Sequence, residues 1–164
     1  MRILGIDPGT VKLGYGLIDE EKSTIVLVHC GVLHEPAKIP IEQRLSSLYR
    51  KLGDIISLYT PDEIAIEEPF VASNVRSAMA IGRAQAIAIL AATERGLPVF
   101  RYLPTTVKQQ VTNYGGSSKE QVQEMVKVHL NLSKKPDSND VADALAIAIC
   151  HINERHLADL VNER

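Results

Sequence analysis

Hydrophobic and polar positions in the first part of the chain follow the pattern of β-strands. Residues 2–7 form a nearly continuous apolar run that ends in Asp7, residues 12–19 alternate in side-chain size, and residues 24–33 are again mostly apolar. A continuous apolar run indicates a strand that is buried on both faces. The connections between the runs are short and turn-like, so we expect an antiparallel meander of three strands.

The rest of the chain alternates between helical and extended patterns. Pro40 suits the first turn of a helix, apolar residues recur at helical spacing after it, and Pro61 ends the pattern. A short apolar strand follows at residues 63–67, and Ser117 and Glu120 form a Ser-x-x-Glu capping box at the start of a later helix. We predict a fifth strand at residues 98–103, helices at residues 74–95, 105–114, 117–132 and 139–155, and a polar tail at residues 156–164.

These elements predict one α/β domain at residues 1–155, with a five-stranded mixed sheet flanked by helices. The helix between the first and fourth strands is a crossover, and the right-handed crossover rule makes these two strands parallel. If they are neighbours, Asp7 and Glu67, which end them, lie side by side. Open α/β sheets place their functional sites at this carboxyl edge.

Asp140 and Asp143 lie in the first turn of the last predicted helix, three residues apart and therefore on one helical face. Each acid alone fits a structural role, as a turn residue, a solvated strand end or a partner of the helix dipole. Together with Asp7 and Glu67, however, they make a carboxylate cluster that is repulsive unless a cation neutralises it. Such ligands suit Mg²⁺ or Mn²⁺, and two ions of this kind catalyse phosphodiester cleavage.

Composition and charge narrow the class of protein. The chain has 164 residues, of which 45% are hydrophobic and 23% charged, as expected of one globular domain with its own core. Its net charge of −2 neither indicates nor excludes nucleic-acid binding. Cys30 and Cys150 stand apart with no CxxC pattern, which argues against a zinc site and favours a reducing, cytoplasmic compartment. The sequence predicts neither a membrane span nor a secretory signal.

Four motifs resemble a known family. They are GIDPGT near the N-terminus, AIEEPF at residues 65–70, VKQQV at residues 107–111 and DVADALAIAI at residues 140–149. In order and spacing they resemble the RuvC family of Holliday-junction resolvases over nearly the whole chain. The resemblance implies a ribonuclease-H-like fold and a homodimer that serves recombination and DNA repair. It also implies paired, metal-dependent nicks in four-way DNA junctions, leaving 5′-phosphate and 3′-hydroxyl ends, and partnership with the RuvA–RuvB branch-migration complex.

The resemblance assigns roles to individual acids. The family's catalytic and metal-binding quartet falls on Asp7, Glu67, Asp140 and Asp143, which implies two Mg²⁺ ions per active site, with Mn²⁺ as a substitute. Members of this family often have Gln where this chain has Glu68. Neighbouring strand residues point to opposite faces, so we assign Glu67 to the metals and expect Glu68 to point away.

The resemblance also suggests DNA-binding residues. Lys108 and Lys119 match family lysines near the active site, where they would offset phosphate charge, although a solvated helix face explains them as well. Phe70 matches a family aromatic that would stack on an unpaired base, and a core position is its alternative. Arg76 is a candidate for a backbone contact that positions DNA. Thr10 either binds phosphate or completes its turn, and we assign no role to His151.

The helix at residues 74–95 is apolar almost all round in its second half. Such a helix is either fully buried or lies at an interface. We expect it to form the two-fold interface of a homodimer, because a resolvase must cut two strands symmetrically. The alternative is a core helix within a monomer.

Other functional classes of protein also fit part of the sequence. The Asp-x-Gly-Thr pattern of residues 7–10 resembles the phosphate loop of the actin and hexokinase group, which needs a second lobe that 164 residues do not accommodate. A DNA-binding module that has lost catalysis would not need four acids. A related nuclease that acts on another branched DNA or on RNA stays open.

Overall fold

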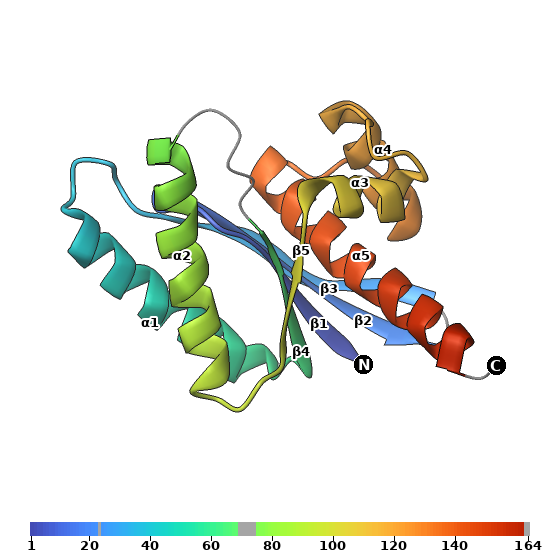
Figure 1. Ribbon diagram of the computed structural model, residues 1–164, viewed down its shortest axis with the longest axis horizontal. Helices are drawn as coiled ribbons and strands as arrows, with labels where there is room; N and C mark the ends of the chain where they lie inside the picture. The colour runs from blue at the N-terminus through green and yellow to red at the C-terminus, as the bar shows by residue number, and fades with distance from the viewer. Residues whose placement is uncertain (23, 69–74, 163–164) are drawn as a thin grey trace.

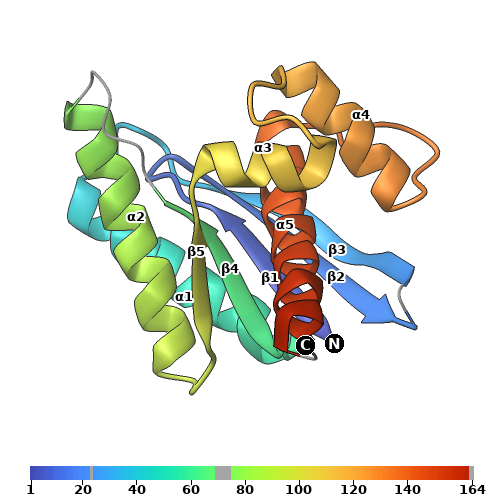
Figure 2. The same cartoon turned by 45° about the vertical axis from the view of Figure 1, so that its right-hand side comes forward.

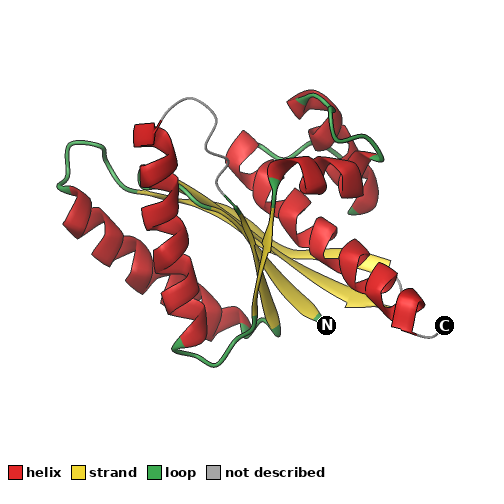
Figure 3. Ribbon diagram, in the orientation of Figure 1, coloured by secondary structure: helices red, strands yellow, loops and turns green. Residues whose placement is uncertain are grey.

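The computed structural model describes residues 1–22, 24–68 and 75–162 of the chain. Its strands are β1 (Arg2–Asp7), β2 (Lys12–Glu21), β3 (Thr24–His34), β4 (Glu63–Glu67) and β5 (Val99–Tyr102). Its helices are α1 (Ile41–Tyr59), α2 (Val75–Thr93), α3 (Pro104–Thr112), α4 (Lys119–His129) and α5 (Asn139–Asn162). One five-stranded sheet lies between α1 and α2 on one face and α3, α4 and α5 on the other (Figures 1 and 3).

The sheet has the predicted mixed topology. Its strand order is β3-β2-β1-β4-β5, in which β1, β2 and β3 form an antiparallel meander and β4 and β5 run parallel to β1. Ile6 of β1 pairs with Ile66 of β4, so the next residues, Asp7 and Glu67, end neighbouring parallel strands. The predicted fold class and the pairing of these two strands are both confirmed.

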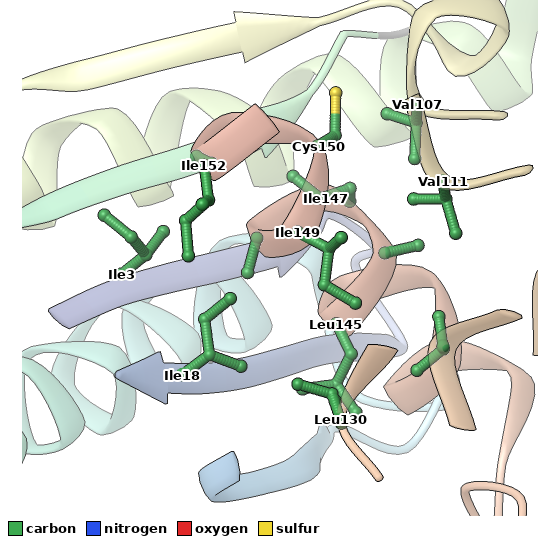
Figure 4. Packing of buried hydrophobic residues seen from close by; sticks show 14 of the residues in the cluster. Ile3, Ile18, Val107, Val111, Leu130, Leu145, Ile147, Ile149, Cys150 and Ile152 are labelled. Atoms are coloured by element: carbon green, nitrogen blue, oxygen red, sulfur yellow. The ribbon is translucent and has the colours of Figure 1, made fainter. Parts of the chain in front are cut away.

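Each face of the sheet has its own hydrophobic core. Leu4 and Ile6 of β1 pack with α1 and α2, whereas Ile3 packs with α5, as the two-residue period of a strand requires. Figure 4 shows the second core, in which Ile3 and Ile18 of the sheet lie beside Leu145 and other apolar residues of α5. The prediction that β1 is buried on both faces is therefore confirmed.

Glycines let α5 lie unusually close to the strands. A Cβ atom on Gly5 would be 2.1 Å from the carbonyl oxygen of Ala144, and one on Gly16 would be 2.5 Å from a methyl carbon of Leu145. A side chain at either position would push the helix away from the sheet. The small residues of β1 and β2 thus set the depth at which α5, and the acids at its start, are seated.

Two predicted boundaries are wrong. The tail predicted at residues 156–164 is helical as far as Asn162, because no glycine or proline follows Arg155 in that stretch and Leu157, Ala158 and Leu160 favour a helix. The capping box at the start of α4 is formed by Ser118 and Gln121, one residue later than predicted. Ser117 is buried instead, and its hydroxyl lies 2.7 Å from the hydroxyl of Thr112.

Of the helices in the described ranges, α2 alone is long and apolar enough to cross a membrane, judging by length and composition only. Ala84, Ala88, Ala91 and Ala92 are nevertheless buried, and three of them belong to the core shared with α1 and the sheet. A core helix passes the same test of length and hydropathy. The sequence predicted no membrane span, whereas α2 meets the criteria of length and hydropathy for one.

Candidate active site at the carboxyl edge of the sheet

Asp7 and Glu67 end the two central parallel strands. Glu63, Ala65 and Glu67 alternate along β4 with the buried Ile64 and Ile66, which belong to the core on the α1 side. Glu67 therefore faces α5, and Glu68 faces the opposite side. Glu68 lies beside Arg101, with 3.8 Å between its Oε1 and Nη1 of the arginine. The predicted opposition of the two glutamates is confirmed.

Asp140 and Asp143 lie at the same edge of the sheet because α5 packs closely against β2. Gly14 of β2 is the cross-strand partner of Asp7. A Cβ atom on Gly14 would lie 2.1 Å from the carbonyl oxygen of Asp140, so the first turn of α5 rests directly on the strand beside Asp7. Figure 2 shows the start of α5 at the edge where β1 and β4 end. The sequence alone did not reveal this role of Gly14, since it depends on a contact through space.

The pKa values show that the four carboxylates share one space. Burial, followed by the charges of Glu67, Asp143 and Asp140, raises the pKa of Asp7 to about 8. Burial and Asp143 raise the pKa of Glu67 to about 7, against the opposing charges of two lysines. Burial also raises the pKa of Asp143, again against those lysines. The cluster therefore resists full ionisation unless a cation is added.

The carboxylates interact electrostatically, but the described side chains do not form a closed metal cage. Within residues 1–22, 24–68 and 75–162, no three Asp, Glu, His or Cys side chains converge tightly enough to enclose a metal ion by themselves. Mg²⁺ usually keeps several waters and is commonly held by one or two carboxylates together with substrate phosphates. The donor set consists of carboxylate oxygens, the chemistry that Mg²⁺ and Mn²⁺ prefer.

Two lysines border the acids on the side of α3 and α4. The Nζ atom of Lys119 is 3.6 Å from Oδ2 of Asp143. Lys108 on α3 is partly buried, and its charge lowers the pKa of both Glu67 and Asp143. A pocket of about 210 Å³ brings these four residues together, and its remaining lining is Pro104, Val107, Val122 and Ala146. Asp7 lies outside this lining, so the pocket is one side of the acidic space.

The loop after Asp7 is held by α1. Thr10 is buried, and Nη1 of Arg44 donates to its carbonyl oxygen at 3.0 Å and to its hydroxyl at 3.2 Å. Gly9 is required, because a Cβ atom there would be 2.1 Å from the carbonyl oxygen of Lys12. The Thr10 hydroxyl is thus engaged in the turn, which supports the structural alternative for this residue. Sequence reasoning missed Arg44, which is 34 residues away.

The other predicted DNA-binding residues are less defined. Phe70 lies outside the described residues. Arg76 is exposed in the first turn of α2, which covers the face of the sheet opposite to α5 but begins at the same end (Figure 1). The structure therefore places Arg76 across the sheet from the lysines, without bringing it into contact with the acids.

Comparison with known proteins agrees with this geometry. Residues 3–151 match the family model of the crossover junction endodeoxyribonuclease RuvC. A protein of that name from Dehalococcoides mccartyi is 50% identical over 163 residues, covering 99% of this chain and 98% of the relative. The structure of Thermus thermophilus RuvC in complex with a Holliday junction substrate is 31% identical and covers 96% of each chain, with a TM-score of 0.91. The chain belongs to the RuvC family of crossover junction endodeoxyribonucleases.

Proposed function

We propose that the protein resolves four-way DNA junctions by paired, divalent-metal-dependent nicks in two opposed strands, in recombination and DNA repair. The observation that carries this proposal is the meeting of Asp7, Glu67, Asp140 and Asp143 around one open space at the edge of the sheet. The names of the relatives in the comparison support the same activity. The match covers 98% of the Dehalococcoides mccartyi relative, so the named activity of that relative does not involve the second lobe that a phosphate-loop kinase needs.

The four acids would hold two Mg²⁺ ions, and Mn²⁺ would substitute for them. When bound, such ions activate the attacking water and stabilise the leaving oxygen. Asp7 occupies the central position, since the charges of all three other acids act on it. The carboxylates must give up their protons for this task, and the ions' charge favours that ionisation. Glu68 takes no part, because it faces Arg101 on the other side of β4.

Lys108 and Lys119 would act on the DNA phosphate. Both lie at the rim of the pocket that contains Glu67 and Asp143. A lysine there offsets the negative charge that the scissile phosphate brings to an acidic site. Phe70 and Arg76 complete the proposed contacts, the first by stacking at the crossover and the second by holding the DNA backbone.

Two sites are needed to cut two strands, and α2 is the proposed dimer interface. The helix buries Ala84, Ala88, Ala91 and Ala92, whereas Val75, Met79 and Leu90 are at least half exposed. An added Cβ on Gly82 meets nothing within 4 Å, so this face leaves room for a partner helix. Sedimentation should show a dimer at micromolar concentration and a monomer for Met79→Glu. A wild-type protein that is monomeric there would contradict the interface.

The remaining partners follow from the same proposal. Junction DNA would arrive from the RuvA–RuvB branch-migration complex, and the enzyme would work in the cytoplasm, where the chromosome lies. A related nuclease activity on another branched DNA or on RNA is the alternative substrate class.

The test is cleavage of a synthetic four-way junction in Mg²⁺, beside a linear duplex of the same sequence and a branched RNA. We expect symmetric nicks in the junction, little cutting of the other two substrates, and no cutting by Asp7→Asn. Equal cutting of the linear duplex would contradict junction specificity. Preferential cutting of RNA would favour the alternative.

A further inference from the structure

His151 forms a buried polar network near the middle of α5, eight residues beyond Asp143. It is 0% exposed, and it is the polar residue in an otherwise apolar stretch of the helix. Its Nε2 lies 2.6 Å from Oε2 of Glu63, and its Nδ1 lies 2.6 Å from the hydroxyl of Tyr102. Arg155 donates to the other carboxylate oxygen of Glu63. The network therefore joins β4, β5 and α5.

The partners define the direction of each hydrogen bond. The carboxylate of Glu63 only accepts, so Nε2 of His151 carries the proton, and Nδ1 accepts from the hydroxyl of Tyr102. Burial lowers the pKa of His151 against the opposing effect of Glu63, and burial raises the pKa of Tyr102. Both side chains are therefore neutral near pH 7. Among the described residues, no buried side-chain nitrogen or oxygen lacks a partner, so the network is fully satisfied.

The network touches both strands that position Glu67. Glu63 is the first residue of β4 and Glu67 is the last. Tyr102 is the register partner of Glu67, and its carbonyl oxygen accepts the Glu68 amide hydrogen at 2.8 Å. On the helix, His151 lies eight residues beyond Asp143, about 12 Å along the axis. Both ends of β4 are thus connected to the helix that carries Asp143.

At its first turn, α5 makes polar side-chain contacts with α4, from Gln123 to Asn139 and from Lys119 to Asp143, but among the described residues it makes none with the sheet. In the parts of the chain that the structure describes, every side-chain hydrogen bond between α5 and the sheet comes from His151, Arg155 or His156. At the acidic end, α5 lies against Gly14 of the sheet, and the carboxylates repel one another. The directional bonds from His151 to β4 and β5 therefore fix the register of α5 on the sheet, eight residues from Asp143.

We propose that Tyr102, His151 and Glu63 form a positioning clamp that sets the separation of Glu67 from Asp143 and thereby tunes the affinity for the metal ions. The inference rests on the proposed metal-binding role of the four acids. None of the three clamp residues touches the substrate in this account, so they are positioning residues and not catalytic ones.

The variant that tests the clamp is Tyr102→Phe, which removes one oxygen atom and leaves the ring in the core. Its matched control is Tyr49→Phe, which removes the hydrogen bond from Tyr49 to Glu94 on the opposite side of the sheet. A second variant, His151→Gln, retains a donor for Glu63 and loses the acceptor for Tyr102. Circular dichroism establishes that each variant is folded.

The first readout is metal binding, measured as the Mn²⁺ concentration for half-saturation in electron paramagnetic resonance without DNA. We expect Tyr102→Phe and His151→Gln to raise it by about threefold to tenfold, as the loss of one buried hydrogen bond allows. Tyr49→Phe should leave it unchanged. Hydrogen exchange at the Glu68 amide should accelerate in the first two variants and stay unchanged in the control.

Cleavage separates failure of the clamp from failure of the proposed site. Tyr102→Phe should need more Mg²⁺ for half-maximal cutting and should recover at saturating Mg²⁺, whereas Glu67→Gln should stay inactive at every concentration. An unchanged metal requirement in Tyr102→Phe beside an inactive Glu67→Gln would overturn the clamp alone. An active Glu67→Gln would overturn the metal site itself. An equal shift in Tyr49→Phe would show a general loss of stability and would also overturn the clamp.

Discussion

The two ends of the central strands shift the pKa values of their aspartates in opposite directions. At the amino end of β1, Arg2 donates to both carboxylate oxygens of Asp19 at 2.8 Å and to the carbonyl oxygen of Tyr59 at 2.7 Å, and its hydrogen bonds to Asp19 lower the pKa of that carboxyl group. At the carboxyl end, burial and like charges raise the pKa of Asp7 to about 8. The charged form of an aspartate is stabilised at one end and destabilised at the other. Perturbed pKa values of the second kind are typical of functional sites.

The largest expected effect separates two adjacent residues of the carboxyl end. Glu67→Gln removes a charge that faces α5, and we expect junction cleavage to fall at least about a hundredfold while junction binding stays intact. Glu68→Gln removes a charge that faces Arg101 and should cut at nearly the wild-type rate. Gel-shift and single-turnover cleavage assays measure both. The reverse result would mean that the register of β4 is wrong.

The next effect concerns the lysines at the rim. Lys108→Ala should slow cleavage by roughly tenfold to a hundredfold and change the junction Kd much less, since its charge acts beside Glu67 and Asp143. The matched control is Lys127→Ala, a partly buried lysine in the last turn of α4. Single-turnover rates at saturating enzyme distinguish the two variants. Equal rates for Lys108→Ala and the wild type would remove this lysine from the site.

The carboxyl end should also lose stability as pH rises when metal is removed. Between the ordinary pKa of 3.8 and the folded value of about 8, folded Asp7 holds a proton that the unfolded chain has released. Folding is therefore progressively disfavoured from about pH 4 to pH 8. In chelator, Asp7→Asn should raise the free energy of unfolding by up to about 5 kcal/mol at pH 8, and by only about 1.5 kcal/mol at pH 5. Urea denaturation at both values measures this, and a variant that is less stable than wild type at pH 8 would contradict it.

At the amino end, the free energy of unfolding should depend on pH in the opposite direction and by a smaller amount. The pKa of Asp19 is lowered by Arg2, so its contribution is present above the unfolded pKa and is lost as pH falls through the folded pKa. Asp19→Asn should cost about 1 kcal/mol at pH 7 because the pair is partly exposed. The difference from wild type should vanish in acid. A stabilised Asp19→Asn at pH 7 would erase the contrast between the two ends.

The sequence predicted the features that depend on local pattern and chain order. The apolar runs before Asp7 and Glu67 identified two buried strands, and the crossover rule predicted that they are parallel; that they are also neighbours is shown by the structure. The spacing of Asp140 and Asp143 placed both at the start of a helix. These inferences succeeded because each needed only periodicity, the handedness of a connection, or the geometry of one helical turn.

The features that depend on contacts through space were missed or misplaced. Gly14 looked like any small strand residue until α5 was seen to rest on it. Arg44 and His151 carry no local signal of the loop and strands that they hold. The capping box moved by one residue because Ser117 is buried against Thr112, a contact that the Ser-x-x-Glu pattern does not encode.

The central claim is that the repulsion at the carboxyl end is relieved by a divalent ion. Thermal unfolding at pH 8 with increasing Mg²⁺, for the wild type and for Asp7→Asn, tests it without DNA or catalysis. The wild type should gain stability steadily with Mg²⁺, by the logarithmic dependence of a ligand that binds the folded state. Asp7→Asn should start higher and gain much less. Equal stabilisation of both proteins by Mg²⁺ would contradict the account.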